Sequence, residues 1–217
     1  MRCHSSDVLQ YDVIIRLNNT EQRGIAVDST NNHVYWIEVA NYNYSENVAS
    51  IQRCDLDGSN KMVILSTVNT TLLTLQLDTR NKWLYFANYS IHTIEKCKLD
   101  GSEKQTVITN ASITYGLAID FSENRIYWTG YVTPYIYSAK LDGTDIRTIH
   151  VSLPQSVKYN LFTGINLYGS YLYVADVGIV YRLEKNQDNA VPVNIGNKIV
   201  TYGVKVIQKE GNPVLFC

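Results

Sequence analysis

Short runs in which apolar and polar residues alternate follow one another along most of the chain, separated by turn-forming residues. The first four such runs occupy residues 24–28, 33–38, 50–56 and 62–65. Alternation with a period of two is typical of β-strands that bury one face, and no stretch shows the longer period of an amphipathic helix. The pattern therefore predicts an all-β chain of short antiparallel strands.

Three short sequence words recur in the same order along the chain. An apolar word ends in an aspartate, at Asp28, Asp78 and Asp120. A word with a central tyrosine follows, at 34–36, 84–86, 126–128 and 172–174. The last word ends in Leu-Asp-Gly, with its Asp-Gly pairs at 57–58, 100–101 and 142–143. Together these words define a repeat of roughly 42 residues.

A repeat of this length with four strands per unit is typical of the blades of a β-propeller. Complete units are expected at 24–65, 74–109, 116–150 and 164–195. Outside them, 203–207 match the first strand of a unit, and 1–3 and 13–17 match its third and fourth strands. The sequence thus predicts four complete blades plus a split blade that lacks its second strand. The two ends of the chain would close this blade and remove exposed sheet edges.

The repeated acidic residues indicate turns rather than catalytic carboxylates. Asp28, Asp78 and Asp120 each end a strand, where an aspartate side chain accepts hydrogen bonds from backbone N–H groups of the next turn. The Asp-Gly pairs favour a type I′ hairpin, in which both central residues have positive φ.

The cysteines indicate packing rather than a disulfide framework. Cys3, Cys54 and Cys97 occupy the same slot of the third strand in successive units. Equivalent slots in stacked sheets lie about 10 Å apart, which is beyond the limit of about 7 Å between the Cα atoms of a disulfide. We therefore expect these three cysteines to be unpaired and buried.

The words at 126–129 (Ile-Tyr-Trp-Thr) and the Leu-Asp-Gly turns resemble the YWTD repeats, or class B repeats, of the low-density lipoprotein receptor family. The resemblance covers nearly the whole chain. It implies that 1–210 form a YWTD-type propeller. Because the family norm is six blades, the chain is either incomplete at its N-terminus or forms an unusual five-bladed ring. It also implies that 211–217 begin a following cysteine-containing module, within which Cys217 pairs. The last Asp of the motif stands only at Asp176, because the matching slots hold Glu38, Asn88 and Gly130.

Composition narrows the choice of partners. A net charge of −1 offers no long-range attraction to nucleic acid, and no apolar run is long enough to insert into a membrane. The first ten residues contain no apolar signal-peptide core, so a complete chain of this sequence would be cytosolic. The family resemblance instead implies an extracellular place, in a membrane receptor ectodomain or a secreted protein. Five sequons favour secretion mildly; the candidate glycosylation sites are Asn18, Asn43, Asn69, Asn88 and Asn110.

The resemblance implies a non-enzymatic ligand-binding or scaffold domain of an endocytic or signalling receptor. Such a domain binds a protein ligand (a lipoprotein or a signalling ligand), or aids its acid-dependent release, beside epidermal-growth-factor-like modules. Phosphate-loop, nucleophile and metal motifs are absent, so neither an enzyme nor a cofactor or metal is expected. The alternatives are a propeller hydrolase or lyase that uses the central channel, and an intracellular assembly scaffold.

Binding specificity is expected in the variable loops between second and third strands and between fourth and first strands, because variable loops on a rigid frame commonly carry it. In a propeller these loops share one face. Tyr and Arg are favoured interface residues, and histidine is the side chain suited to a response to endosomal pH. The candidate contacts are Arg23, Tyr42, Tyr44, His92, Tyr115, Tyr131, Tyr135 and Tyr202.

Overall fold

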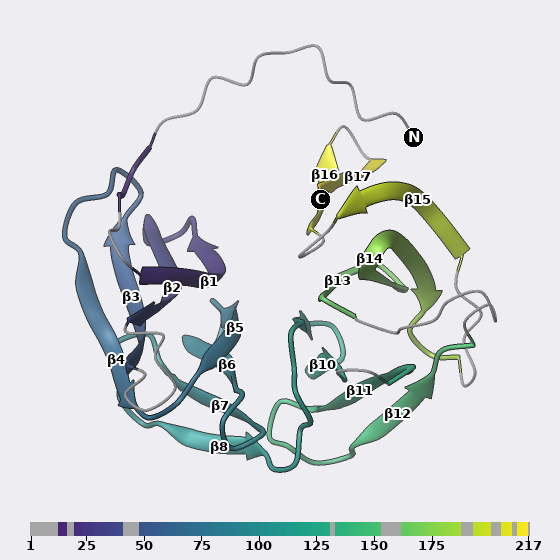
Figure 1. The fold of residues 1–217 in the computed structure, drawn as a ribbon, viewed down its shortest axis with the longest axis horizontal. Coiled ribbons are helices and arrows are strands. Elements are labelled where there is room, and N and C mark those ends of the chain that lie inside the picture. Colours follow the sequence, from purple (N-terminus) through teal and green to yellow (C-terminus); the bar gives the residue numbers. More distant parts are fainter. Residues whose placement is uncertain are drawn as a thin grey trace.

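The computed structural model describes residues 13–16, 20–40, 48–130, 133–152, 162–187, 193–200, 205–209 and 212–216. Within these residues the chain forms seventeen β-strands and no helix. The strands make sheets that follow one another around a common axis, as the blades of a propeller do (Figure 1). The predicted all-β propeller of antiparallel blades is confirmed.

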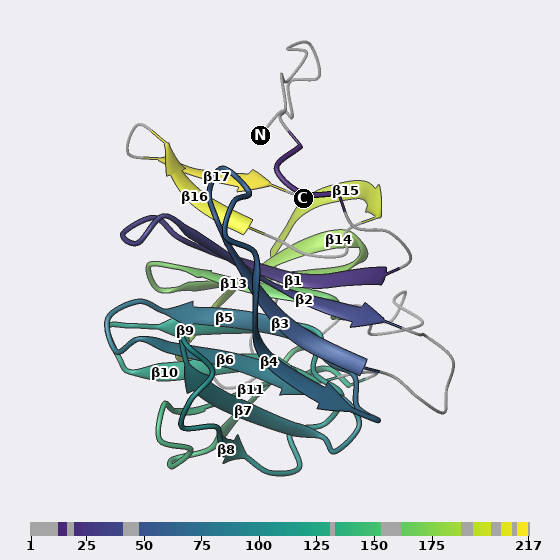
Figure 2. The same cartoon turned by 90° about the vertical axis from the view of Figure 1, so that its left-hand side faces the viewer.

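Three sheets have four strands each, hydrogen-bonded in chain order. The first blade contains β1 (Thr20–Asp28), β2 (His33–Ala40), β3 (Val48–Asp55) and β4 (Met62–Val68). The second contains β5 (Leu72–Asp78), β6 (Trp83–Asn88), β7 (Thr93–Lys98) and β8 (Gln105–Ile108). The third contains β9 (Leu117–Asp120), β10 (Arg125–Thr129), β11 (Tyr135–Lys140) and β12 (Arg147–His150). The first strand of each blade lies nearest the axis, and β1 and β5 lie side by side (Figures 1 and 2).

The fourth blade is built from three strands, and one long strand occupies both the second and the third positions of the blade. These strands are β13 (Gly164–Tyr168), β14 (Tyr171–Glu184) and β15 (Val193–Val200). The first part of β14, as far as Ala175, pairs with β13, whereas its second part pairs with β15. Figure 1 shows β14 curling back on itself between these two neighbours. Because β14 supplies both middle positions, the fourth predicted blade is present.

A fifth sheet contains β16 (Lys205–Lys209) and β17 (Asn212–Phe216), which pair antiparallel. β16 lies against β13, in the place of a first strand. β17 adds a second strand, where the repeat predicted none for the split blade. The sequence missed β17 because none of the three repeat words occurs in it. The assignment of 211–217 to a following module stays a prediction.

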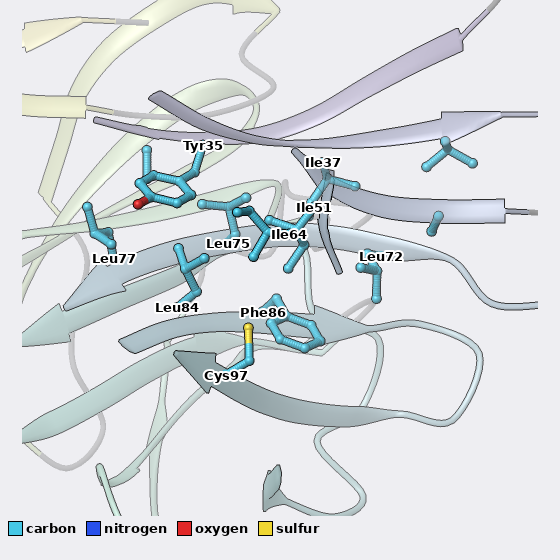
Figure 3. Close-up of a cluster of buried hydrophobic side chains, with 13 residues drawn as sticks. Tyr35, Ile37, Ile51, Ile64, Leu72, Leu75, Leu77, Leu84, Phe86 and Cys97 are labelled. Carbon is cyan, nitrogen blue, oxygen red and sulfur yellow. The ribbon is translucent and has the colours of Figure 1, made fainter. Parts of the chain in front are cut away.

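The core lies between blades. Side chains of one blade that face the next, such as Tyr35 and Ile37, pack against those of the next blade that face back, such as Leu75, Leu84 and Phe86 (Figure 3). All five are nearly inaccessible to solvent. The tyrosines at the same slot in the second and third blades, Tyr85 and Tyr127, are fully buried too. The aromatic stripes of the repeat therefore hold adjacent sheets together.

Cysteines of the third strands contribute to the same interfaces. Cys54 and Cys97 are buried and unpaired, as the sequence predicted. Burial raises the pKa of the Cys97 thiol to about 12, so this thiol is a small apolar filler at neutral pH. Cys3 and Cys217 lie outside the described residues.

The Asp-Gly turns differ from the predicted type I′ form. Gly58 and Gly101 have φ near 85°, but the aspartates before them are not among the residues with positive φ. The N–H of Gly58 donates to the carbonyl of Asp55, which describes a type I turn followed by a left-handed glycine. Asp57 stabilises this form because its Oδ1 accepts the backbone N–H of Ser59 at 2.9 Å.

Glycine is required at these turns for a second reason. A Cβ atom on Gly101 would lie 2.0 Å from the carbonyl oxygen of Ile64, on the fourth strand of the preceding blade. A Cβ on Gly58 would lie 2.1 Å from the carbonyl oxygen of Ile14. Ile14 therefore takes the same position relative to the first blade as Ile64 takes relative to the second. This placement supports the prediction that 13–17 form the outer strand of the split blade.

On the face of the first blade that points away from the second blade, the side chains of the innermost strand, β1, are exposed to solvent in the described part of the structure. Ile25 and Val27 are 68% and 51% exposed, whereas Leu75 and Leu77, at the same slots of the second blade, are 1% and 9% exposed. A hollow of about 400 Å³ runs along this face. The predicted closure of the ring by the two ends of the chain depends on residues outside the described part of the structure.

Candidate functional site

The ring has two ends with different chemistry. One end, which we call the turn end, carries the tight turns between first and second strands and between third and fourth strands. The other, the loop end, carries the remaining connections. At the turn end the three repeated aspartates accept bonds from backbone N–H groups, and Asp28 accepts those of Thr30 and Asn31 at 3.1 Å. Asp28 and its equivalents are therefore turn-forming residues, as predicted.

At the loop end, the connection between β6 and β7 is bonded to the connections on both sides of it. The N–H of Tyr89 donates to the carbonyl of Thr71 at 2.8 Å, and the N–H of Thr71 donates to Oγ of Ser90 at 3.0 Å. On the other side, the N–H of Ala111 donates to the carbonyl of His92 at 2.8 Å. We call residues 69–71, 89–92 and 109–116 the loop platform. Its backbone bonds make it a fixed surface.

Large apolar side chains stand exposed on the loop platform. Tyr89 is 40% exposed, Ile91 59% and Tyr115 38%. Tyr115 was a candidate from sequence, but Tyr89 and Ile91 were not. Comparing the blades could have found Tyr89 and Ile91, because the β6–β7 connection that contains them differs in sequence from the corresponding β2–β3 and β10–β11 connections.

A buried polar network supports the loop platform from below. Asn88 is 4% exposed; its Oδ1 accepts Oγ1–H of Thr70 at 2.8 Å and its Nδ2 donates to Glu95 at 3.0 Å. Glu95 also pairs with Lys104 at 2.9 Å. A glycan on Asn88 would break this network, so we expect Asn88 to carry none; the five glycosylation candidates stay predictions.

Two other sequons have a structural reason of their own. Asn69 and Asn110 are exposed on the loop platform, with φ of 54° and 55°. Asparagine is enriched in this left-handed conformation, so their presence does not require a glycan. Their exposure leaves both available to carry one. Asn18 and Asn43 lie outside the described residues.

The remaining candidate contacts are spread over the loop end. Arg23 in β1 pairs with Glu21, Nε to Oε1, at 2.8 Å. His92 is exposed beside Tyr89, with 6.3 Å between ring centroids. Tyr135 begins β11 and packs against His150 at 5.4 Å. The structure thus assigns these residues to one end of the ring but to three blades. The candidates Tyr42, Tyr44, Tyr131 and Tyr202 lie outside the described residues.

Within the described ranges, no group of three or more His, Cys, Asp or Glu side chains is placed to hold a metal ion. That part of the chain also forms no helix with the length and apolar character needed to cross a membrane.

No family model matches the chain. Solved structures show the same fold at low identity. A chain of a nidogen/laminin complex is 17% identical, with a TM-score of 0.58, over 82% of this chain and 81% of that one. A luciferin-regenerating enzyme is 12% identical, with a TM-score of 0.60, over 84% and 78%. A gluconolactonase from Xanthomonas campestris is 15% identical, with a TM-score of 0.57, over 86% and 79%.

These similarities define the class of fold, a β-propeller, and correct one expectation. From the absence of catalytic motifs in the sequence, we expected a protein that is not an enzyme. That conclusion is wrong as an inference, since a luciferin-regenerating enzyme and a gluconolactonase have the same fold. Propeller enzymes need no short local motif, because residues from separate blades can meet at the axis.

Proposed function

We propose that the protein is a binding domain whose loop platform contacts a protein ligand. The observation that carries this proposal is the exposure of Tyr89, Ile91 and Tyr115 on a backbone fixed by hydrogen bonds to both sides. Exposed aromatic residues that are already held in place lose little conformational entropy on binding. A chain of a nidogen/laminin complex with the same fold supports protein binding as the role of such a surface.

We further propose that the domain acts outside the cell, as part of a membrane receptor ectodomain or a secreted protein. The repeat words at 126–129 and the Leu-Asp-Gly turns support this proposal through their resemblance to the low-density lipoprotein receptor family.

The test of the binding proposal is a triple variant, Tyr89→Ala with Ile91→Ser and Tyr115→Ala. Binding is first measured by biolayer interferometry against laminin and a panel of secreted proteins. For a partner so identified, we expect about a 100-fold loss of affinity, because aromatic anchors commonly dominate interface energy. The matched control is Leu56→Ser with Ile146→Ser, which removes exposed apolar side chains at the turn end. Equal losses in both variants, or no loss in the triple variant, would place the interface elsewhere.

The extracellular proposal has its own test. When the chain is secreted from cultured mammalian cells behind an added signal peptide, Asn69 and Asn110 should carry glycans and Asn88 should not. Asn69→Gly and Asn110→Gly should each remove one glycan mass, since glycine keeps the left-handed backbone. Intact-mass spectrometry before and after glycosidase treatment measures this. A glycan found on Asn88, or none on the other two, would contradict the assignment.

A further inference from the structure

The junction between the third and fourth blades contains a polar cavity at the turn end, away from the loop platform. The cavity measures about 440 Å³ and is lined by residues of β10, β11 and β12 and by the turn after β14. This volume falls in the range of small-molecule sites, about 300–1,000 Å³. The proposed function leaves this cavity without a role.

The cavity is open because this junction departs from the repeat. Ser138 of β11 occupies the register position that Lys96 occupies in β7. At the junction before, Lys96 extends across the gap, with its Nζ 3.4 Å from the carbonyl oxygen of Leu141 and 4.7 Å from the ring centroid of Trp83. The short Ser138 side chain cannot do this, so the volume remains unfilled.

Two further departures bring guanidinium groups to the cavity. Arg125 occupies the register position of Trp83, and Arg147 that of Gln105. The Arg125 side chain is 4% exposed and is held by Asp145, Nη1 to Oδ2, at 2.7 Å. Arg147 shares the same carboxylate at 2.7 Å but is 62% exposed. A buried arginine thus forms the wall, and a solvent-exposed one stands at the rim.

A lysine completes the set of cations. Lys185, which follows β14, occupies the position in the fourth blade that Leu141 occupies in the third. The backbone N–H of Leu141 donates to the carbonyl of Asn124, and that of Lys185 donates to the carbonyl of Ser170, in the first turn of each blade. The Lys185 Nζ lies 2.5 Å from Asp120 and 2.7 Å from Glu123, with only 8% of the side chain exposed. Burial lowers the pKa of Lys185, but bonds to both carboxylates outweigh this and raise it, so the ammonium stays charged.

The charges leave one exposed cation, Arg147, for an anionic group of a ligand. Three cations, Arg125, Arg147 and Lys185, face three carboxylates, Asp120, Glu123 and Asp145, so the cavity is neutral when empty. Arg147 is paired at the surface, where an ion pair contributes little, so it can turn from Asp145 to an incoming carboxylate. A dianion would have to displace the buried pairs as well.

The rest of the lining includes the hydroxyl and amide groups of Ser138, Thr148, Asn186 and Gln187, beside the side chains of Tyr127 and Ile149. Such groups both donate and accept hydrogen bonds and therefore suit ligand hydroxyls. We propose that this cavity binds a small hydroxylated monocarboxylic acid of the sugar-acid class. Its carboxylate pairs with Arg147, near the Lys185 ammonium, which keeps its bonds to Asp120 and Glu123, and its hydroxyl groups bond to the neutral lining.

The test measures binding of glucuronate to the whole chain by isothermal titration calorimetry, with glucose and inorganic phosphate as comparison probes at equal ionic strength. A ligand of this size suits a Kd of about 1 mM. The variants Arg147→Gln and Lys185→Leu restore the residues that the repeat carries elsewhere, so the fold should tolerate them. Each should weaken glucuronate binding at least tenfold. Lys61→Leu removes a lysine of the first blade and should leave binding unchanged.

Absence of glucuronate binding, or equal binding by Lys185→Leu, would overturn the proposal. Phosphate bound as tightly as glucuronate would show a general anion site and overturn the sugar-acid class. Glucose bound as tightly as glucuronate would overturn that class too.

Methyl glucuronide separates two sources of a sugar acid, the end of a glycan and a free sugar acid. If it binds as well as the free acid, the natural ligand is a glycan terminus; if it fails while the free acid binds, the ligand is a free sugar acid. Both results support the site.

Discussion

Replacing Asp120 by alanine is expected to lower the free energy of unfolding by about 3–5 kcal/mol at neutral pH, because it leaves a buried lysine without its main partner. Asp120 is 2% exposed and accepts bonds from the Lys185 ammonium and from backbone N–H groups of Ser122 and Glu123. The matched control is Asp78→Ala. Asp78 makes the same turn bonds, with Arg80 and Asn81 as donors, and should cost only about 1–2 kcal/mol.

The effect of Asp120→Ala depends on pH with a definite sign. Burial raises the pKa of Asp120, but hydrogen bonds from Lys185 and Ser122 outweigh it, so the pKa lies below its ordinary value. The stabilisation is therefore complete above the unfolded pKa of about 3.9 and is lost as the pH falls through the folded pKa. Urea titrations at pH 7 and at pH 3 should show the gap between wild type and variant narrowing in acid. A gap that is constant with pH would contradict the ion-pair account.

Replacing Gly101 by alanine is expected to lower the free energy of unfolding by roughly 3 kcal/mol. About 1–2 kcal/mol comes from the left-handed backbone, and about 1–3 kcal/mol from moving the neighbouring strand, since the added Cβ meets the Ile64 carbonyl oxygen at 2.0 Å. The matched control is Gly169→Ala. Gly169 has φ of 58° with nothing within 4 Å of the added Cβ, so only the backbone cost applies.

Urea denaturation followed by tryptophan fluorescence measures both glycine variants. Equal destabilisation by Gly101→Ala and Gly169→Ala would mean that the approach of adjacent blades does not constrain the turn. A larger loss at Gly101 would mean that each Leu-Asp-Gly turn locks its blade to the one before.

The repeat predicted the blades because the residues that recur are those that hold sheets together. Tyr35, Tyr85 and Tyr127 lie at one slot and are all buried between blades. Their period in sequence is therefore the period of the structure. β17 was missed since a strand at the end of the repeat need not carry its words, and the type I turn was missed since the aspartate side chain favours it over type I′.

The residues of the two proposed sites were predicted less well from the sequence, because most of them depart from the repeat. Tyr89 and Ile91 stand in a connection that only the structure ties to its neighbours. Ser138, Arg147 and Lys185 are far apart in sequence, and each substitution alone looks like ordinary variation. Their meeting at one cavity follows from the twist and stacking of two sheets, which no period in the sequence specifies.

The pairwise packing of blades has a consequence for how such a ring can change. The junction filled by Phe86, between the first two blades, shares no side chain with the junction that contains Ser138, between the third and fourth. The effects of a mutation at one junction are therefore confined to the two blades that meet there, and the other junctions are unaffected. In a fold of this kind, one interface between blades can evolve from a packed contact into a ligand-binding cavity while the other interfaces keep the protein folded.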